Sequence, residues 1–74
     1  MGVIKMLNTK TIYVKTKYFI MEDETKHFDN LDKAYEFAKK QSKNDKVNFC
    51  MVYVNELLNR VYDFGTIATI NQVK

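Results

Sequence analysis

The stretch LDKAYEFAKKQSK (residues 31–43) decides the fold class, because it is the one convincing helix pattern in the chain. At about 100° per residue, its apolar side chains gather on one face and its charged side chains on the opposite face. Ala34, Ala38 and Ser42 follow one another along the middle of the apolar stripe. Small residues in this stripe let the helix backbone lie close to a sheet that carries large side chains.

Strand patterns lie on both sides of this helix. Residues 11–21 alternate along the chain and are rich in β-branched and aromatic side chains, which is typical of a strand. Residues 25–28 can return as a short antiparallel partner. After the helix, residues 47–54 and 60–66 predict a hairpin with a turn of two or four residues, and residues 66–70 either extend its second strand or add an edge.

These elements predict an α+β fold, in which a small antiparallel sheet, in ββαββ order along the chain, has one amphipathic helix packed on one face. Seventy-four residues are enough for one domain and too few for a catalytic and a regulatory one. We therefore expect a single α+β domain over residues 11–74, preceded by an uncertain N-terminal lead-in over residues 1–10.

The expected sheet has more apolar surface than one helix can cover, because both faces of its strands carry apolar side chains. The sheet face that the helix leaves uncovered must be solvated, pack on a tail or contact a partner, and it is therefore the main functional clue. We expect the aromatic face of the hairpin beneath the alanine stripe; it collects Phe49, Met51, Tyr53, Arg60, Tyr62 and Phe64. The outer face then carries Tyr13, Lys15, Lys17, Phe19, Met21, Cys50, Val52, Val54 and Val61.

Composition indicates a folded domain of the cytoplasm. The chain is 46% hydrophobic and 14% aromatic, which is typical of a globular protein. Residues 1–10 lack a continuous apolar run, and no stretch approaches membrane-spanning length, so we expect neither a signal peptide nor a membrane association. The single cysteine, Cys50, excludes an internal disulfide and a cysteine-based zinc site. An unpaired cysteine without an export signal favours the cytoplasm.

The charge balance leaves nucleic-acid binding open as an alternative function. The net charge is +3, and eleven of the twelve basic residues are lysines. Nucleic acids are usually gripped by bidentate arginine, so a solvated lysine surface is the simpler account. Aromatic side chains interleaved with lysines on a sheet can nevertheless stack unpaired bases and hold phosphates. The alternative site for single-stranded nucleic acid consists of Tyr13, Lys15, Lys17 and Phe19.

Residue types that carry catalysis or bind cofactors are sparse, so we expect no enzyme activity, no metal and no cofactor. Covalent catalysis needs a nucleophile with a base in reach. Cys50 and His27 are the only such pair, and a cysteine in an apolar strand is usually an inert packing residue. The acidic run at residues 22–24 is consecutive, so its side chains diverge, and it lacks the spacing of a calcium loop. The chain has no glycine-rich phosphate loop.

The surplus sheet face therefore predicts binding rather than chemistry. We expect a small protein-binding module that occludes or tethers a larger protein, or that pairs with a second copy as a homodimer. The candidate contact residues are Phe19, Val52, Val54 and Val61, which form an apolar patch on the expected outer face. The outline resembles that of short phage and mobile-element proteins, among them single-helix anti-CRISPR proteins. This resemblance implies an inhibitor or adaptor acting on a host protein; it carries over no site residue, because no diagnostic motif supports it.

Overall fold

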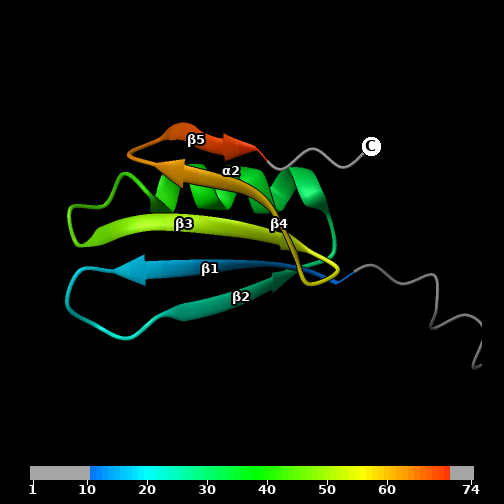
Figure 1. Ribbon diagram of the computed structural model, residues 1–74, viewed down its shortest axis with the longest axis horizontal. Coiled ribbons are helices and arrows are strands. Elements are labelled where there is room, and N and C mark those ends of the chain that lie inside the picture. Colours follow the sequence, from blue (N-terminus) through cyan, green and yellow to red (C-terminus); the bar gives the residue numbers. More distant parts are fainter. Residues whose placement is uncertain (1–10, 71–74) are drawn as a thin grey trace, which may run out of the picture.

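The computed structural model describes residues 11–70, with side chains through residue 68, and confirms the predicted α+β fold. One helix packs on an antiparallel sheet of five strands in this part of the chain (Figure 1). In chain order the elements are β1 (Ile12–Tyr18), β2 (Glu24–Phe28), α2 (Leu31–Gln41), β3 (Val47–Val54), β4 (Leu57–Asp63) and β5 (Thr66–Ile70).

The strand order across the sheet is β2-β1-β3-β4-β5, and every neighbouring pair is antiparallel. Strand β5 adds an edge beside β4, which decides between the two expectations for residues 66–70. Strand β1 ends at Tyr18 and not at the predicted residue 21. The reason is that its pairing with β2 ends at Thr16 opposite Glu24, so the following residues form a loop between the two strands.

Helix α2 begins at the predicted residue, Leu31, and ends at Gln41, two residues before the predicted end at residue 43. Asn30 is the N-cap, and its side chain accepts a hydrogen bond from the backbone N–H of Lys33 at 3.1 Å. Asp32 lies in the first turn, and two lysines lie in the last turn, where each charge suits the helix dipole. The buried residues of the helix are Ala34 and Ala38, as the small-residue stripe requires.

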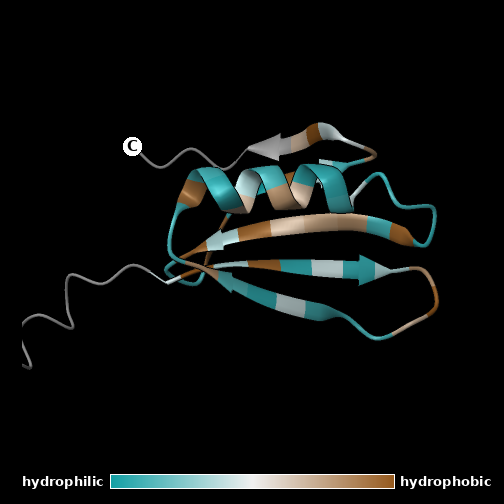
Figure 2. Cartoon of the chain, turned by 180° about the vertical axis from the view of Figure 1, so that it is seen from behind, coloured by the Kyte–Doolittle hydropathy of each residue, from teal (hydrophilic) through white to brown (hydrophobic). Residues whose placement is uncertain are grey.

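The core lies between this stripe and one face of the sheet, and the helix covers only that face (Figure 2). Beneath the helix, β1 contributes Ile12, Val14 and Thr16, and all three side chains are buried. Strand β3 contributes Cys50 and Val52, and β4 contributes Tyr62. The buried strand residues are mostly small or β-branched, because a helix with an alanine stripe lies close to the sheet and leaves little height beneath it.

The expected face of β3 is therefore wrong. Phe49, Met51 and Tyr53 were expected beneath the helix, but Cys50 and Val52 occupy that place, with Val54 partly buried beside them. For β4 the expectation holds for Tyr62, which lies on the helix side, and for Arg60, whose guanidinium stacks on the ring of Tyr35 in α2, 3.9 Å from its centroid. It is wrong for Phe64, which lies in the turn beyond the end of β4 and is 72% exposed.

A β-bulge explains why the two strands of this hairpin disagree. The turn has two residues, Asn55 and Glu56, both with positive φ, so Val54 pairs with Leu57. Between this pair and the pair of Val52 with Arg60, β4 contains one extra residue. A single extra residue moves all later side chains of a strand to the opposite face. Cys50 and Val52 thereby share a face with Arg60 and Tyr62, which neither expected turn length allowed.

The end of the helix holds the turn between β4 and β5 in place. The buried hydroxyl of Ser42 accepts a hydrogen bond from the Gly65 backbone N–H at 2.7 Å and donates one to the carbonyl of Lys39 at 2.9 Å. Gly65 has a φ of 80°, and a Cβ there would lie 2.5 Å from Cε of Lys43. Glycine is favoured at this position by its backbone conformation, since the lysine side chain is flexible and can move aside.

The face assignment predicts opposite fates for two neighbouring substitutions. Val52→Glu would place a carboxylate in the core, at a cost of several kcal/mol against a total stability of about the same size for so small a domain. Met51→Glu would place the same group opposite Lys15 of β1, where an attractive cross-strand pair forms. We expect Val52→Glu to lose the cooperative thermal transition in circular dichroism and Met51→Glu to keep it. The reverse result would contradict the face assignment.

Candidate functional site: the open sheet face and the loop end

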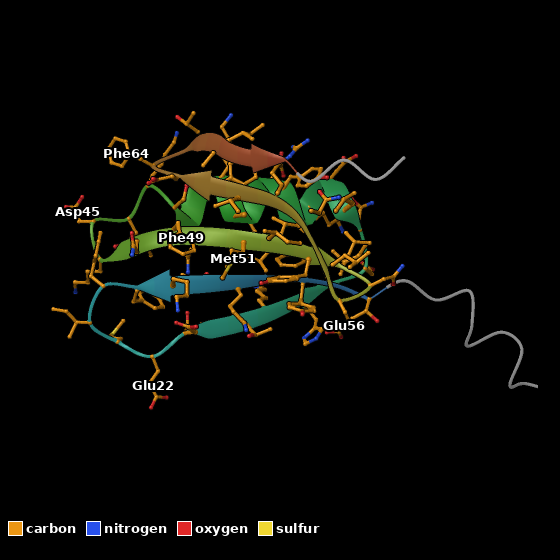
Figure 3. All side chains as sticks on the ribbon, in the orientation of Figure 1. Glu22, Asp45, Phe49, Met51, Glu56 and Phe64 are labelled. Carbon is orange, nitrogen blue, oxygen red and sulfur yellow. The ribbon has the colours of Figure 1, made fainter. Side chains whose placement is uncertain are left out.

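The face of the sheet opposite the helix is covered by none of the residues that the structure describes, and we call it the open sheet face. Figure 3 shows Phe49 and Met51 on this face, in front of the sheet. Its residues form rows across the strands, in which Tyr13 pairs with Tyr53, Lys15 with Met51, and Lys17 with Phe49. Val61 of β4 extends the row of Met51. The open sheet face consists of Tyr13, Lys15, Lys17, Phe49, Met51, Tyr53 and Val61, each of which is half-buried.

Aromatic rings form a ladder across one end of the open sheet face. The rings of Tyr13 and Tyr53 stack on each other with centroids 5.0 Å apart and an angle of 14°. The ring of His27 in β2 lies 5.4 Å from that of Tyr13. The Tyr13 hydroxyl donates a hydrogen bond to Glu56, and partial burial together with this carboxylate raises the pKa of Tyr13. Each of the two stacked rings covers one face of the other and restrains its rotation.

The two lysines of the open sheet face differ in their surroundings. Lys15 Nζ lies 6.0 Å from the ring centroid of Tyr53 and makes no ion pair with any residue between 11 and 68. Lys17 forms an ion pair with Asp23 of the loop, with 3.3 Å between Nζ and Oδ2. This pair is exposed and therefore weak, but it offsets the charge of Lys17. Lys15 is the cation available to a ligand on this face.

The structure separates the residues predicted to bind a partner. Val52 is fully buried, and Val54 packs against the core, so their expected place on the outer face is wrong, for the reason given by the bulge. Val61 lies on the open sheet face as expected. Phe19 lies beyond the end of β1, where it is 64% exposed. Of the four residues of the alternative nucleic-acid site, Tyr13, Lys15 and Lys17 lie together, because they are alternate residues on the open face of β1.

The large side chains of β3 are the part of this face that the sequence analysis missed. Phe49, Met51 and Tyr53 were expected in the core because the face of the hairpin that carries them has fewer polar residues than the other face. A signal in the sequence does distinguish the faces of β3: Cys50 and Val52 match the small and β-branched residues Ile12 and Val14 of β1.

A second exposed apolar region lies at one end of the molecule, and we call it the loop end. It comprises the loop between β1 and β2, the loop between α2 and β3, and the turn between β4 and β5, which lie at the same end of the sheet (Figure 1). Three consecutive apolar residues of the first loop are exposed: Phe19 at 64%, Ile20 at 96% and Met21 at 56%. Against the second loop they line a hollow of about 380 Å³, together with Tyr18, Asp45 and Lys46.

Phe64 is exposed at the same end and has an unusual backbone conformation. It occupies the two-residue turn between β4 and β5 with a φ of 53°, followed by Gly65 with a φ of 80°, and its side chain is 72% exposed. Such turns favour asparagine or glycine at the position of Phe64. A left-handed conformation costs a residue with a Cβ roughly 1–2 kcal/mol, and a bulky residue there is an outlier. The ring of Phe64, which is mostly exposed, contributes little burial in return.

The candidate catalytic residues are not brought together. Cys50 is buried beneath the helix beside Thr16, with 3.7 Å between sulfur and hydroxyl, whereas His27 faces the opposite side of the sheet beside Tyr13. Burial raises the pKa of the Cys50 thiol, and the hydrogen bond with Thr16 opposes this only in part. The acidic run at residues 22–24 is exposed, and residues 11–68 contain no group of three side chains arranged to hold a metal ion.

Comparison with known proteins gives no relative from which a role could be transferred: no family model, no curated protein and no solved structure matches this chain. Helix α2 is far too short to cross a membrane, and no other helix occurs in the described part of the chain.

The buried thiol gives a direct prediction. Because Cys50 is buried and its raised pKa keeps it protonated at neutral pH, a thiol reagent should reach it only when the domain opens. We expect the folded protein at pH 7.5 to react with a chromogenic disulfide reagent at least about 100-fold more slowly than the urea-unfolded chain. Rates within tenfold of each other would show that Cys50 is accessible and reopen its candidacy as a nucleophile.

Proposed function

We propose that this chain is a small non-enzymatic protein-binding module of the cytoplasm, and that it docks on a larger protein through the open sheet face. The observation that carries the proposal is the one-sided cover of the sheet: helix α2 protects one face, and the other carries three large apolar side chains on its central strand, Phe49, Met51 and Tyr53. Tyrosine, phenylalanine and methionine are enriched in the centres of protein interfaces.

The arrangement of the open sheet face suits an interface in two further respects. Its apolar centre is rigid, since the Tyr13–Tyr53 stack fixes the rings before a partner binds, and a rigid aromatic surface loses little conformational entropy on binding. Its charged residues, Lys15 and Lys17, lie on β1 beside this centre and not within it. An inhibitor or adaptor of a phage or mobile element would need no more than such a face, because occluding a host protein requires contact area and no catalytic group.

The same face supports single-stranded nucleic acid as a second candidate ligand. Tyr13 and Lys15 lie next to Tyr53 and Phe49, so rings and a cation share one surface, which is the combination that binds unpaired bases and phosphates. Protein binding is the better-supported function, because the stacked tyrosines already use one face of each ring and Lys17 is paired with Asp23.

Protein binding predicts that Met51→Glu abolishes partner capture while the domain stays folded. The tagged protein is incubated with nuclease-treated host lysate, and captured proteins are quantified by mass spectrometry. We expect a partner captured by the wild type to fall at least about tenfold with Met51→Glu, since a charge would be buried at the centre of the interface. The matched control is Leu57→Glu, the same kind of change at an apolar residue that is 58% exposed outside the open sheet face. Equal capture by all three proteins would contradict the proposal.

Nucleic-acid binding predicts a salt-dependent affinity that involves Lys15. The probe is a fluorescein-labelled oligothymidylate, and its anisotropy is followed at several salt concentrations. We expect Lys15→Ala to reduce the slope of log affinity against log salt by about 0.7, the value for one phosphate contact on a single strand. Lys33→Ala, an exposed lysine on the helix, should leave the slope unchanged. If the wild type does not bind at low salt, or both variants behave alike, this candidate is excluded.

A further inference from the structure

We propose that the loop end is a self-association site. Phe64 of one copy enters the apolar hollow of a second copy, and Phe64 of the second copy enters the hollow of the first. This inference is independent of the proposed function, because it uses a different surface and concerns the protein alone. It rests on three observations: a hollow lined by apolar side chains, an exposed ring in a costly conformation, and the position of both at one end of the molecule.

The hollow needs an apolar occupant. Phe19, Ile20 and Met21 form its apolar side, and the loop that carries them is tied to the α2–β3 loop by a hydrogen bond from the Phe19 backbone N–H to the Lys46 carbonyl at 3.1 Å. Its volume of about 380 Å³ is at the lower end of the range for ligand pockets, which is ample for one aromatic ring. Three consecutive large apolar residues exposed to solvent are unfavourable unless something covers them.

Phe64 is suited to be that occupant. Its side chain points out from the end of the molecule, away from the sheet (Figure 3). The turn that carries it is held firmly, since the Gly65 backbone N–H donates to the buried Ser42 hydroxyl and Lys43 packs over the glycine. The two-residue turn itself requires this positive φ, but asparagine or glycine would meet the requirement at lower cost, so a large exposed ring at this position indicates a role in binding. The anchored turn thereby fixes the backbone from which the ring projects.

A twofold axis makes the contact reciprocal. Phe64 and the hollow lie at the same end of the sheet, so two copies meeting end to end can each offer a ring and accept one, as a closed twofold dimer requires. The charges match this arrangement. The exposed Asp63 precedes Phe64, and the hollow is lined by Lys46, so each ring that enters a hollow brings a carboxylate towards an ammonium group. Lys43 beside the turn and Asp45 beside the hollow form the second complementary pair.

The expected dimer is weak. The molecule measures 27 × 17 Å across its long axis, so an end-on contact is well below the roughly 800 Å² per partner of a standard interface. We expect a dissociation constant in the range of about 10 μM to 1 mM. Both open sheet faces stay uncovered in such a dimer, because they lie along the molecule and not at its end.

The decisive substitution is Phe64→Asn, because it should change stability and association in opposite directions. Asparagine tolerates the left-handed conformation, so the Tm of the monomer, measured in the low micromolar range, should rise by about 4 °C or more. Sedimentation equilibrium should meanwhile show that the concentration-dependent rise in mass, from 8.8 kDa towards twice that value, is lost. Ile20→Ser should also remove the rise, and Leu57→Ser, at the opposite end of the sheet, should not.

Three results would overturn the inference: a wild type that stays monomeric at 1 mM, a dimer that survives Phe64→Asn, or a dimer lost only with Met51→Glu. The last would place self-association on the open sheet face. A sample that mixes ¹³C-labelled and unlabelled protein gives an independent test, since nuclear Overhauser effects between the Phe64 ring of one copy and Ile20 or Met21 of the other are expected. The first two outcomes leave partner capture through Met51 unaffected, so the two proposals fail separately.

Discussion

The close packing of small residues between helix and sheet is the constraint on which the rest of this structure depends. Ala34 and Ala38 of α2 are fully buried, and the strand residues below them include Val14, Cys50 and Val52, none of which is exposed. Because neither side has bulk, the helix backbone lies near the sheet, and dispersion contacts are dense although no large side chain is fully buried. No disulfide supports this packing in the described part of the chain, since Cys50 is a free cysteine.

This constraint explains where the large side chains lie. A core with little height between helix and sheet cannot hold Phe49, Met51 and Tyr53. The pairing of β3 with β1 turns them to the other face, and the bulge in β4 keeps Tyr62 on the helix side. Tyr62 is the exception, since it lies on β4 towards the margin of the helix and meets the ring of Tyr35, 6.4 Å between centroids. The apolar area that a larger helical layer would have buried therefore becomes available for binding.

The two exposed apolar regions differ in a way that separates their proposed roles. The open sheet face is broad, half-buried and rigid, with stacked rings at one end and Lys15 beside its centre. The loop end is narrow and highly exposed, and Phe64 is held there by a turn that is anchored on Ser42. The larger area of the open sheet face suits it to a larger partner. The self-complementarity of the loop end suits it to another copy of the chain. Cys50 takes part in neither, because it belongs to the core.

The sequence by itself determined the fold class, the helix, the two-sided apolar character of the sheet, and the outward side of β1, because these follow from local periodicity. Tertiary structure alone decided which face of β3 lies on the same side of the sheet as Tyr62 of β4. A one-residue bulge near Asn59 leaves no periodic signal in β4, yet it reverses the face that every later residue shares with its neighbour. The gathering of Phe19, Ile20, Met21 and Phe64 at one end likewise depended on where β1 and β4 end. Strand pairing fixes those ends, and it is a property of the whole sheet and not of any one segment.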